Sequence, residues 1–354
     1  MKYVQFNCEK NYVQDFINLS KKLYRKDNTE DSNELKSILE GKHKLCKYFK
    51  LYKFLVYEKN IVVGRFAITT YPNDDTAYIG FFECINSKEV AKFIFDIARK
   101  FAKENNYKRI VGPVDASFWL KYRLKINLFD KVPYTGEPYN KDYYYKMFLD
   151  NNYKVIEHYT SSIYQKVDFN FENKLYSERY NSFIKKGYQI ESPNMDEFES
   201  ILKDLYGLLT DIYSDFPIYK NIELSDFIDI FRKYKKIMNP EMIKLAYYNN
   251  KLVGFYISVP NYNNLVYNIN LVRLINILKL KRKPKEYVML YMGVDQEHRG
   301  LGKAIVYSII TELKKSNLPS IGALARDGKV TQNYIEELIE NKYEYVLLEE
   351  KFYD

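Results

Sequence analysis

The sequence predicts an α/β protein of two domains, each a twisted mixed β-sheet flanked by helices. Three observations support this fold class. The chain has 354 residues, which suits two domains of common size. Short runs of strand-like alternation are interspersed with helical periodicity along the whole chain. The order of these elements then repeats in the second half, which indicates an internal duplication.

In the first half the hydrophobic pattern predicts a helix over residues 12–24, strands over 49–58, 61–70 and 76–83, a helix over 88–105, a strand over 108–112, a helix over 141–151 and a strand over 154–165. In the second half it predicts a strand over 188–191, helices over 197–213 and 224–238, strands over 243–248, 252–259 and 286–294, a helix over 301–315, a strand over 320–325, a helix over 331–340 and a strand over 345–351.

Two pairs of residues anchor the duplication. Gly64 and Gly254 each stand near the start of the second strand of a hairpin, and they are 190 residues apart. Tyr153 and Tyr343 each follow a corresponding helix, again 190 residues apart. Hydrophobic periodicity lapses in between, so we expect domains over residues 1–167 and 187–354, joined by a linker over 168–186.

The composition is that of a globular protein, since 46% of the residues are hydrophobic and 17% are aromatic. The formal net charge is +9, with one dense basic run at residues 279–285. Such a charge suits an anionic partner, for example the phosphates of CoA, a tRNA or a membrane surface. More often, however, such lysines only solvate the surface.

The cysteines Cys8, Cys46 and Cys84 are few and far apart, which argues against a disulfide framework and fits a reducing compartment. Clustered Cys and His residues are absent, so we expect no metal site. The N-terminus begins with a strand-like pattern rather than the apolar core of a signal peptide, and no run of about 18 apolar residues occurs. We therefore expect a cytoplasmic protein without a membrane span or a membrane partner.

The clearest chemical pattern joins the strand at 286–294 to the helix at 301–315. It reads Asp295-Gln296-Glu297-His298-Arg299-Gly300-Leu301-Gly302-Lys303-Ala304. Glycines let a backbone approach a ligand closely, and the free N–H groups at a helix N-terminus attract anions. The order of residues fits neither a Walker A loop nor a complete dinucleotide fingerprint. It predicts an anion site in which Gly300 and Gly302 leave room for the ligand.

Residues 299–304 resemble the Gln/Arg-x-x-Gly-x-Gly/Ala motif of the GNAT superfamily of acyl-CoA-dependent N-acetyltransferases, and residues 293–298 resemble the approach to that motif. The resemblance covers residues 188–351. It implies a transferase that moves an acetyl or other short acyl group from CoA to a primary amine by direct attack, without a metal. It implies a cofactor-binding role for Met292, Gly293, Val294, His298, Arg299, Gly300, Leu301, Gly302, Lys303, Ala304 and Asn333.

The corresponding loop of the first half, residues 83–90, contains no glycine. This resembles tandem GNAT proteins in which one copy is degenerate, so we expect one acyl-CoA site per chain. Residues 112–119 and 138–144 resemble motifs of uncharacterised bacterial tandem proteins. We expect the first half either to buttress the second or to contribute an acceptor pocket. The residues expected in that pocket are Asp115, Trp119, Tyr122 and Arg123.

The resemblance leaves the catalytic groups open. Many GNAT enzymes carry a proton-donating Tyr five residues before the aromatic that follows the last helix, but counting back from Tyr343 gives Leu338. Tyr334, one helical turn earlier, is the substitute candidate. Glu286 is the acid on the central strand that precedes Asp295, and it is the candidate base or else a solvated residue at the strand end.

Two other functions fit parts of the sequence. One is an aminoacyl-tRNA-dependent transferase of the Fem type, which the positive charge favours and the intact loop at 299–304 disfavours. The other is a non-enzymatic acyl-CoA-binding sensor or interaction protein, which the absence of Tyr at Leu338 favours.

Overall fold

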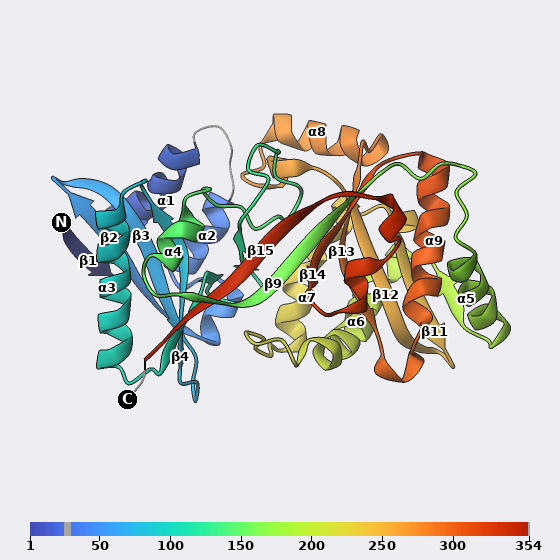
Figure 1. Ribbon diagram of the computed structural model, residues 1–354, viewed down its shortest axis with the longest axis horizontal. Helices are drawn as coiled ribbons and strands as arrows, with labels where there is room; N and C mark the ends of the chain where they lie inside the picture. Colours follow the sequence, from blue (N-terminus) through green and yellow to red (C-terminus); the bar gives the residue numbers. More distant parts are fainter. Residues whose placement is uncertain (25–29, 353–354) are drawn as a thin grey trace.

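A computed structural model describes residues 1–24 and 30–352 of the chain. It consists of two halves that lie side by side along the long axis of the molecule (Figure 1). The first half contributes strands β1 (Lys2–Phe6), β2 (Lys50–Glu58), β3 (Ile61–Thr70), β4 (Thr76–Cys84), β5 (Arg109–Gly112), β6 (Val114–Asp115), β7 (Lys121–Tyr122), β8 (Leu124–Lys125) and β9 (Lys154–Tyr164). The second half contributes strands β10 (Gln189–Glu191), β11 (Ile243–Tyr248), β12 (Lys251–Pro260), β13 (Tyr287–Val294), β14 (Ser320–Arg326) and β15 (Ile339–Lys351).

Nine α-helices occur among the described residues. They are α1 (Lys10–Tyr24), α2 (Ser32–Leu39), α3 (Lys88–Glu104), α4 (Tyr144–Leu149), α5 (Lys174–Lys185), α6 (Phe198–Tyr213), α7 (Leu224–Arg232), α8 (Leu271–Arg282) and α9 (Leu301–Ser316). Short 3₁₀ turns include η3 (Lys233–Ile237), η7 (Val330–Asn333) and η8 (Glu336–Leu338).

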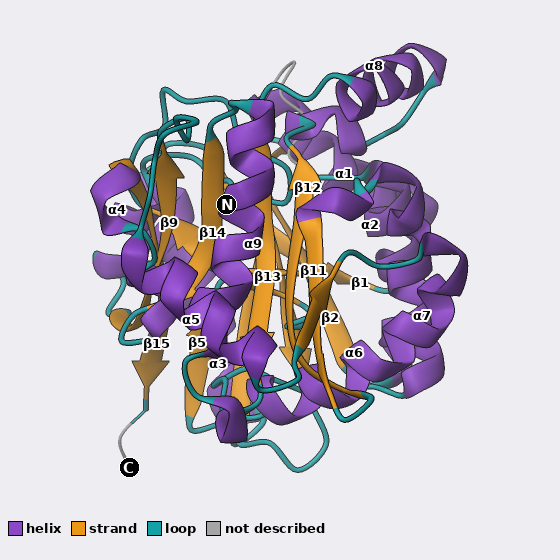
Figure 2. Ribbon diagram, turned by 90° about the vertical axis from the view of Figure 1, so that its right-hand side faces the viewer, coloured by secondary structure: helices purple, strands orange, loops and turns teal. Residues whose placement is uncertain are grey.

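One sheet runs through both halves. Its order in the described residues is β1-β2-β3-β4-β5-β15-β9-β14-β13-β12-β11-β10, with β8 also paired to β15, while β6 and β7 form a separate ribbon. Helices cover both faces (Figure 2). Residues of α1, α2, α6 and α7 share one apolar core that extends across both halves, whereas α3 with α4, and α9 with α5, cover two separate cores. The predicted α/β fold class is therefore confirmed.

The two halves are joined by β9 and β15. These strands pair antiparallel along most of their length, from Ile339 opposite Tyr164 to Glu349 opposite Lys154. The end of β15, from Leu348 onward, also pairs with β5, and β9 pairs in turn with β14. The last strand of the chain thus completes the sheet of the first half, and the last strand of the first half completes that of the second.

A buried polar network stabilises this junction. The side chains of Lys125 and Glu137 are fully buried, and Lys125 Nζ lies 2.8 Å from Glu137 Oε1. The Tyr345 hydroxyl of β15 donates to the same carboxylate at 2.7 Å and lies 3.1 Å from the Tyr134 hydroxyl. Because a buried charge is costly without partners, these contacts fix the loop over residues 133–137 in one position.

The structure corrects two predicted segments and adds two helices that the sequence did not predict. The helix predicted over 331–340 is two 3₁₀ turns, because Ile335 has a φ of 51° and Leu338 accepts a hydrogen bond from Gln165 N beside β9. Strand pairing therefore prevails over helical periodicity, and β15 begins at Ile339. The predicted linker at 168–186 contains helix α5. The two helices that the sequence did not predict are α2 and α8, and the first part of the basic run lies at the end of α8. The domain ranges 1–167 and 187–354 stay a prediction, and one sheet crosses the boundary between them.

Candidate functional site

The second half contains an opening between two parallel strands. β13 pairs with β14 only from Tyr287 to Met289, although β13 stays paired with β12 as far as Val294. Leu290 forms a β-bulge at the point where β13 and β14 separate, because its neighbours Met289 and Tyr291 pair with consecutive residues of β12. From Leu290 to Val294 the edge of β13 that faces β14 has no partner strand, so its N–H and C=O groups are available to an extended ligand.

Helix α9 begins directly beyond this opening. Gly300, its N-terminal cap, has a φ of 90° and provides no side-chain acceptor for the first amides, so these donors are left for a ligand. The positive φ explains the glycine, because L side chains rarely adopt that conformation. A Cβ at Gly300 would lie 3.8 Å from Arg179 Nη1 of α5. Arg179, Arg299 and Lys303 therefore bring positive charge to the same helix end, which suits an anion.

The packing around Gly302 gives a steric reason for a glycine at this position. An ideal Cβ there would lie 2.2 Å from the Tyr334 hydroxyl and 3.3 Å from Met292 Cε. The space on the Cβ side of Gly302 is thus filled by Tyr334, and the role of Gly302 toward a phosphate stays a prediction. Burial raises the pKa of Tyr334 to about 12, so its hydroxyl keeps its proton at neutral pH.

The other residues assigned to the loop have distinct positions. The side chains of Leu301 and Ala304 are buried in the core under α9, so they could reach a ligand only through their backbone amides. His298 Nδ1 forms a 2.6 Å hydrogen bond with Tyr188, whose ring stacks on Tyr248, and this contact holds the imidazole against an aromatic pair. The Asn333 side chain lies outside the described part of the structure, and its backbone ends a 3₁₀ turn rather than opening a helix.

In the first half the equivalent strands, β4 and β5, also separate, but the gap between them is filled. β4 pairs with β5 only from Thr76 to Tyr78. The following chain then folds back against β4, so that a Cβ at Gly80 would lie 1.8 Å from Val114 O. Asp115 Oδ1 accepts a 2.5 Å hydrogen bond from Phe81 N. The first half therefore occupies with its own backbone the edge that the second half leaves unpaired.

The helix that follows this closed opening is also capped. Ser87 caps α3 by accepting from Val90 N, and Glu89 places an acid in the first turn. A capped helix start next to a carboxylate disfavours an anion, which is the opposite of the arrangement at α9.

Comparisons with known proteins agree with this arrangement. No family model and no curated protein matches the sequence. Among solved structures, a tandem GNAT protein from the clavulanic acid biosynthesis pathway matches over 99% of this chain and 98% of its own, with a TM-score of 0.53 and 9% identity. The chain has a tandem GNAT fold.

Further structures share this GNAT fold. A GCN5-related N-acetyltransferase from Sphaerobacter thermophilus covers 99% of the chain and 95% of its own, with a TM-score of 0.50 and 10% identity. A glucosamine N-acetyltransferase region of a fungal multi-domain β-N-acetylglucosaminidase covers 99% of this chain but only 38% of its own, with a TM-score of 0.54 and 13% identity. Identities this low show the fold alone.

Glu286, the candidate base, lies just before β13. Its carboxylate accepts a 2.5 Å hydrogen bond from the Asn261 amide, and burial raises its pKa. Leu290 is four positions further along the chain, which corresponds to about 13 Å along a strand. The loop over residues 133–137 also reaches this point, since a Cβ at Gly136 would lie 3.6 Å from Leu290 Cδ2.

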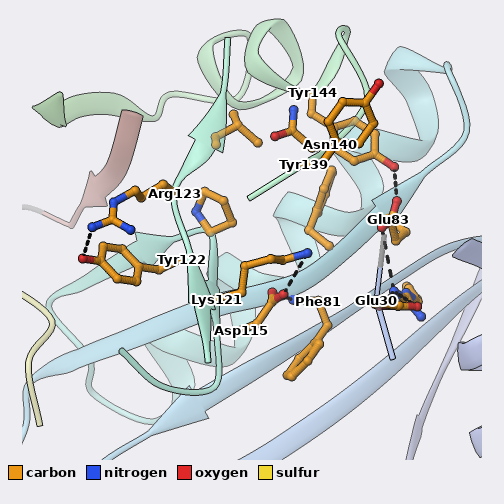
Figure 3. Close-up of a pocket in the computed structure, with 14 residues that line it drawn as sticks. Glu30, Phe81, Glu83, Asp115, Lys121, Tyr122, Arg123, Tyr139, Asn140 and Tyr144 are labelled. Atoms are coloured by element: carbon orange, nitrogen blue, oxygen red, sulfur yellow. Dashed lines mark hydrogen bonds and ion pairs between the residues drawn. The ribbon is translucent and has the colours of Figure 1, made fainter. Parts of the chain in front are cut away.

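Three of the four expected acceptor residues line one pocket in the first half, namely Asp115, Tyr122 and Arg123 (Figure 3). Trp119 does not line it. Instead, its Nε1 donates to Lys220 O at 2.8 Å, and its ring packs against Phe227 of α7. Trp119 therefore belongs to the packing between the halves.

Arg123 lies at the end of the pocket that faces the second half. Its guanidinium is 3.8 Å from the centre of the Tyr122 ring and 4.2 Å from that of Tyr159, and it donates to the Tyr122 hydroxyl. Removal from water raises the pKa of Tyr213 on α6, and the positive charge of Arg123 opposes this rise. The same charge opposes the raised pKa of Tyr291 on β13, whose side chain is 45% exposed. Arg123 thus connects the pocket to the opening beside β13.

The inner end of the pocket holds buried charges that the sequence did not single out. Arg65 forms a two-pronged ion pair with Glu30 at 2.8 and 3.0 Å, and it is only 1% exposed. Glu83 lies 3.8 Å from the same guanidinium and accepts hydrogen bonds from the hydroxyls of Tyr24 and Tyr144. The sequence predicts the strand that contains Glu83, but the residues that contact its carboxylate come from α1, β3 and α4, which no local pattern brings together.

Within residues 1–24 and 30–352, no cluster of three or more His, Cys, Asp or Glu side chains is arranged to hold a metal ion. In the same part of the chain, no helix has the length and apolarity required to cross a bilayer.

We expect Glu83 to make stability depend on pH. Removal from water raises its pKa from 4.5 to about 7, against the opposing charge of Arg65. The folded state keeps this proton up to about pH 7, whereas the unfolded chain releases it near pH 4.5, so the contribution of Glu83 to the free energy of unfolding falls as the pH rises through this window. The shift corresponds to about 3 kcal/mol.

Urea unfolding of Glu83→Gln and of the parent at several pH values tests this. The parent should lose up to about 3 kcal/mol relative to the variant between pH 4.5 and pH 8. The exposed Glu89→Gln variant is the matched control. A parent and a Glu83→Gln variant with parallel pH profiles would show that Glu83 is not the responsible group.

Proposed function

We propose that the chain is an acyl-CoA-dependent N-acyltransferase whose cofactor binds in the second half. One observation carries this proposal. The unpaired edge of β13 leads directly to an uncapped, positively charged helix start at Gly300, while the equivalent edge and helix of the first half are closed by Val114, Asp115 and Ser87. The residues present fit a phosphate-bearing thioester, with the amides of α9 toward the phosphates and those of β13 toward the extended arm.

CoA would supply an activated acyl group as a thioester. With it bound, a neutral amine would attack the acyl carbon, so that a C–N bond forms while the C–S bond breaks and a thiolate leaves. Glu286 lies about 13 Å along the strand from Leu290, so it would take the proton lost by the amine only through a chain of water molecules, and Tyr334 would give its hydroxyl proton to the leaving thiolate. The raised pKa values fit these roles, since a raised pKa makes the carboxylate of Glu286 a stronger base and keeps the hydroxyl of Tyr334 protonated at neutral pH.

The acceptor amine would approach from the first half, between Arg123 and Tyr291. Only a neutral amine has the lone pair needed for attack. A fixed positive charge lowers the pKa of a nearby amine and so favours the neutral form. Arg123 supplies that charge, and the aromatic side chains of Tyr122 and Tyr291 form the adjoining wall.

The first test of this function is binding. Calorimetry with acetyl-CoA should give one site per chain. Arg299→Ala should weaken binding by about 1–3 kcal/mol, because it removes a charged hydrogen-bond donor from the helix start. Ser87→Ala in the first half is the control and should leave both the stoichiometry and the affinity unchanged. A stoichiometry near zero or near two would contradict the proposal.

The role of Tyr334 is tested separately by Tyr334→Phe. The variant keeps the ring over Gly302 and loses only the hydroxyl, so the affinity for acetyl-CoA should change by less than about twofold. The value of kcat should fall by about 100-fold, the usual contribution of a positioned acid. An unchanged kcat would show that the hydroxyl only packs against Gly302.

The acceptor side is tested by the pH dependence of kcat across a panel of primary amines, because kcat reports groups in the bound complex. In Arg123→Gln the pKa of the bound amine should rise, so the ascending limb of the profile should move to higher pH, with CoA affinity unchanged. Trp119→Phe serves as a packing control and should keep the parental profile. Identical profiles for Arg123→Gln and the parent would remove Arg123 from the site. If acetyl-CoA binds but no amine turns over, the sensor function is the better account.

A further inference from the structure

Helix α8 exposes an apolar stripe to solvent. Leu271, Leu274, Ile275 and Leu278 follow the spacing of one helix face, and they are between 43% and 73% exposed. Val272, beside the stripe, is 67% exposed. Figure 2 shows α8 projecting from the body of the protein at the top of the view. An exposed apolar patch of this kind marks an interaction surface.

The opposite side of α8 is fixed to the protein, so the stripe cannot turn inward. Ile277 is 2% exposed. The Arg273 guanidinium donates to the backbone carbonyl of Tyr267, and Asn270 caps the helix by accepting from Arg273 N at 3.0 Å. Near the other end, Lys281 Nζ donates to Lys236 O at 2.8 Å. The orientation of the apolar stripe is therefore part of the fold.

Positive charge accompanies the apolar stripe. The end of α8 and the residues after it expose Lys279, Arg282, Lys283 and Lys285. The adjacent turn η3 exposes Lys235 and Lys236. No Asp or Glu occurs between residues 251 and 285. Two elements that are distant in sequence thus combine into one basic surface beside the stripe.

The apolar stripe and the basic surface together favour one kind of partner over the others. A second copy of the chain would bring two basic clusters together, which is unfavourable. A nucleic acid would use the lysines but would leave the apolar stripe in water. An anionic bilayer would contact both the apolar stripe and the lysines, because apolar side chains insert at the level of the headgroups while cations contact the lipid phosphates.

In place of the expectation that the protein has no membrane partner, we propose that α8 docks it on an anionic membrane surface. The helix has 12 residues, or about 18 Å, which is too short to span a bilayer and suits a position in the plane of the interface. Docking leaves the candidate CoA loop accessible, because α8 precedes β13 and the loop follows it, about 26 Å away along the strand. This proposal does not depend on the transferase activity.

Co-sedimentation of the full chain with vesicles tests the proposal. At about 0.1 M salt, binding to phosphatidylcholine vesicles that contain phosphatidylglycerol should exceed binding to pure phosphatidylcholine by at least about tenfold. The double variant Leu274→Ser with Leu278→Ser should lose about tenfold in binding, and so should Lys279→Gln combined with Lys283→Gln. The control is Lys92→Gln with Lys100→Gln on α3, which removes two other exposed charges and should bind like the parent.

All substitutions are at exposed positions, and circular dichroism checks that each variant is folded. Equal binding of the α8 variants and the parent would overturn the proposal, as would a lack of preference for the anionic lipid. Concentration-dependent self-association that the serine variant abolishes, without vesicle binding, would assign α8 to a dimer interface instead. Binding to single-stranded DNA or tRNA without vesicle binding would assign the basic surface to nucleic acid.

Discussion

The pairing of β15 with β9 is the constraint on which the rest of the molecule depends. Each half contributes its last strand to the part of the sheet that the other half forms, so each part of the sheet is completed by a strand from the other half. The buried pair Lys125 and Glu137 lies at this junction, where the cost of leaving either charge alone favours one arrangement. As a result, the loop over residues 133–137 lies against Leu290 of β13.

The two halves share a fold but differ at the gap between their central parallel strands, which is filled in the first half and open in the second. Both have strands that part after three paired residues. In the first half the chain after Gly112 folds back over the gap, and Asp115 satisfies the amide that the gap exposes. In the second half the gap stays unpaired and ends at a glycine-capped helix. The difference resides in backbone hydrogen bonding, so a closed copy can still supply side chains such as Arg123 to the open one.

Helix α9 is supported by a helix that the duplication does not provide. In the first half α4 packs beside α3, whereas in the second half the corresponding segment forms two short turns. Helix α5 packs against α9 in that region and brings Arg179 to its N-terminus. The change also frees Tyr334 from a helix, which lets its hydroxyl reach Gly302. Local loss of one helix thus changes both the charge and the shape of the candidate site.

The sequence by itself determined the α/β fold class, the duplication, most strands and helices, and the position of the loop at residues 299–304, because these depend on periodicity and on glycine at fixed positions. It could not determine α5 or the turns at 330–338, since strand pairing and packing override local preference there. Only the tertiary structure joined Arg65, Glu83 and Asp115 into one pocket, separated Trp119 from it, and turned the apolar face of α8 outward. These arrangements arise from contacts between residues far apart in the chain, which no local pattern encodes.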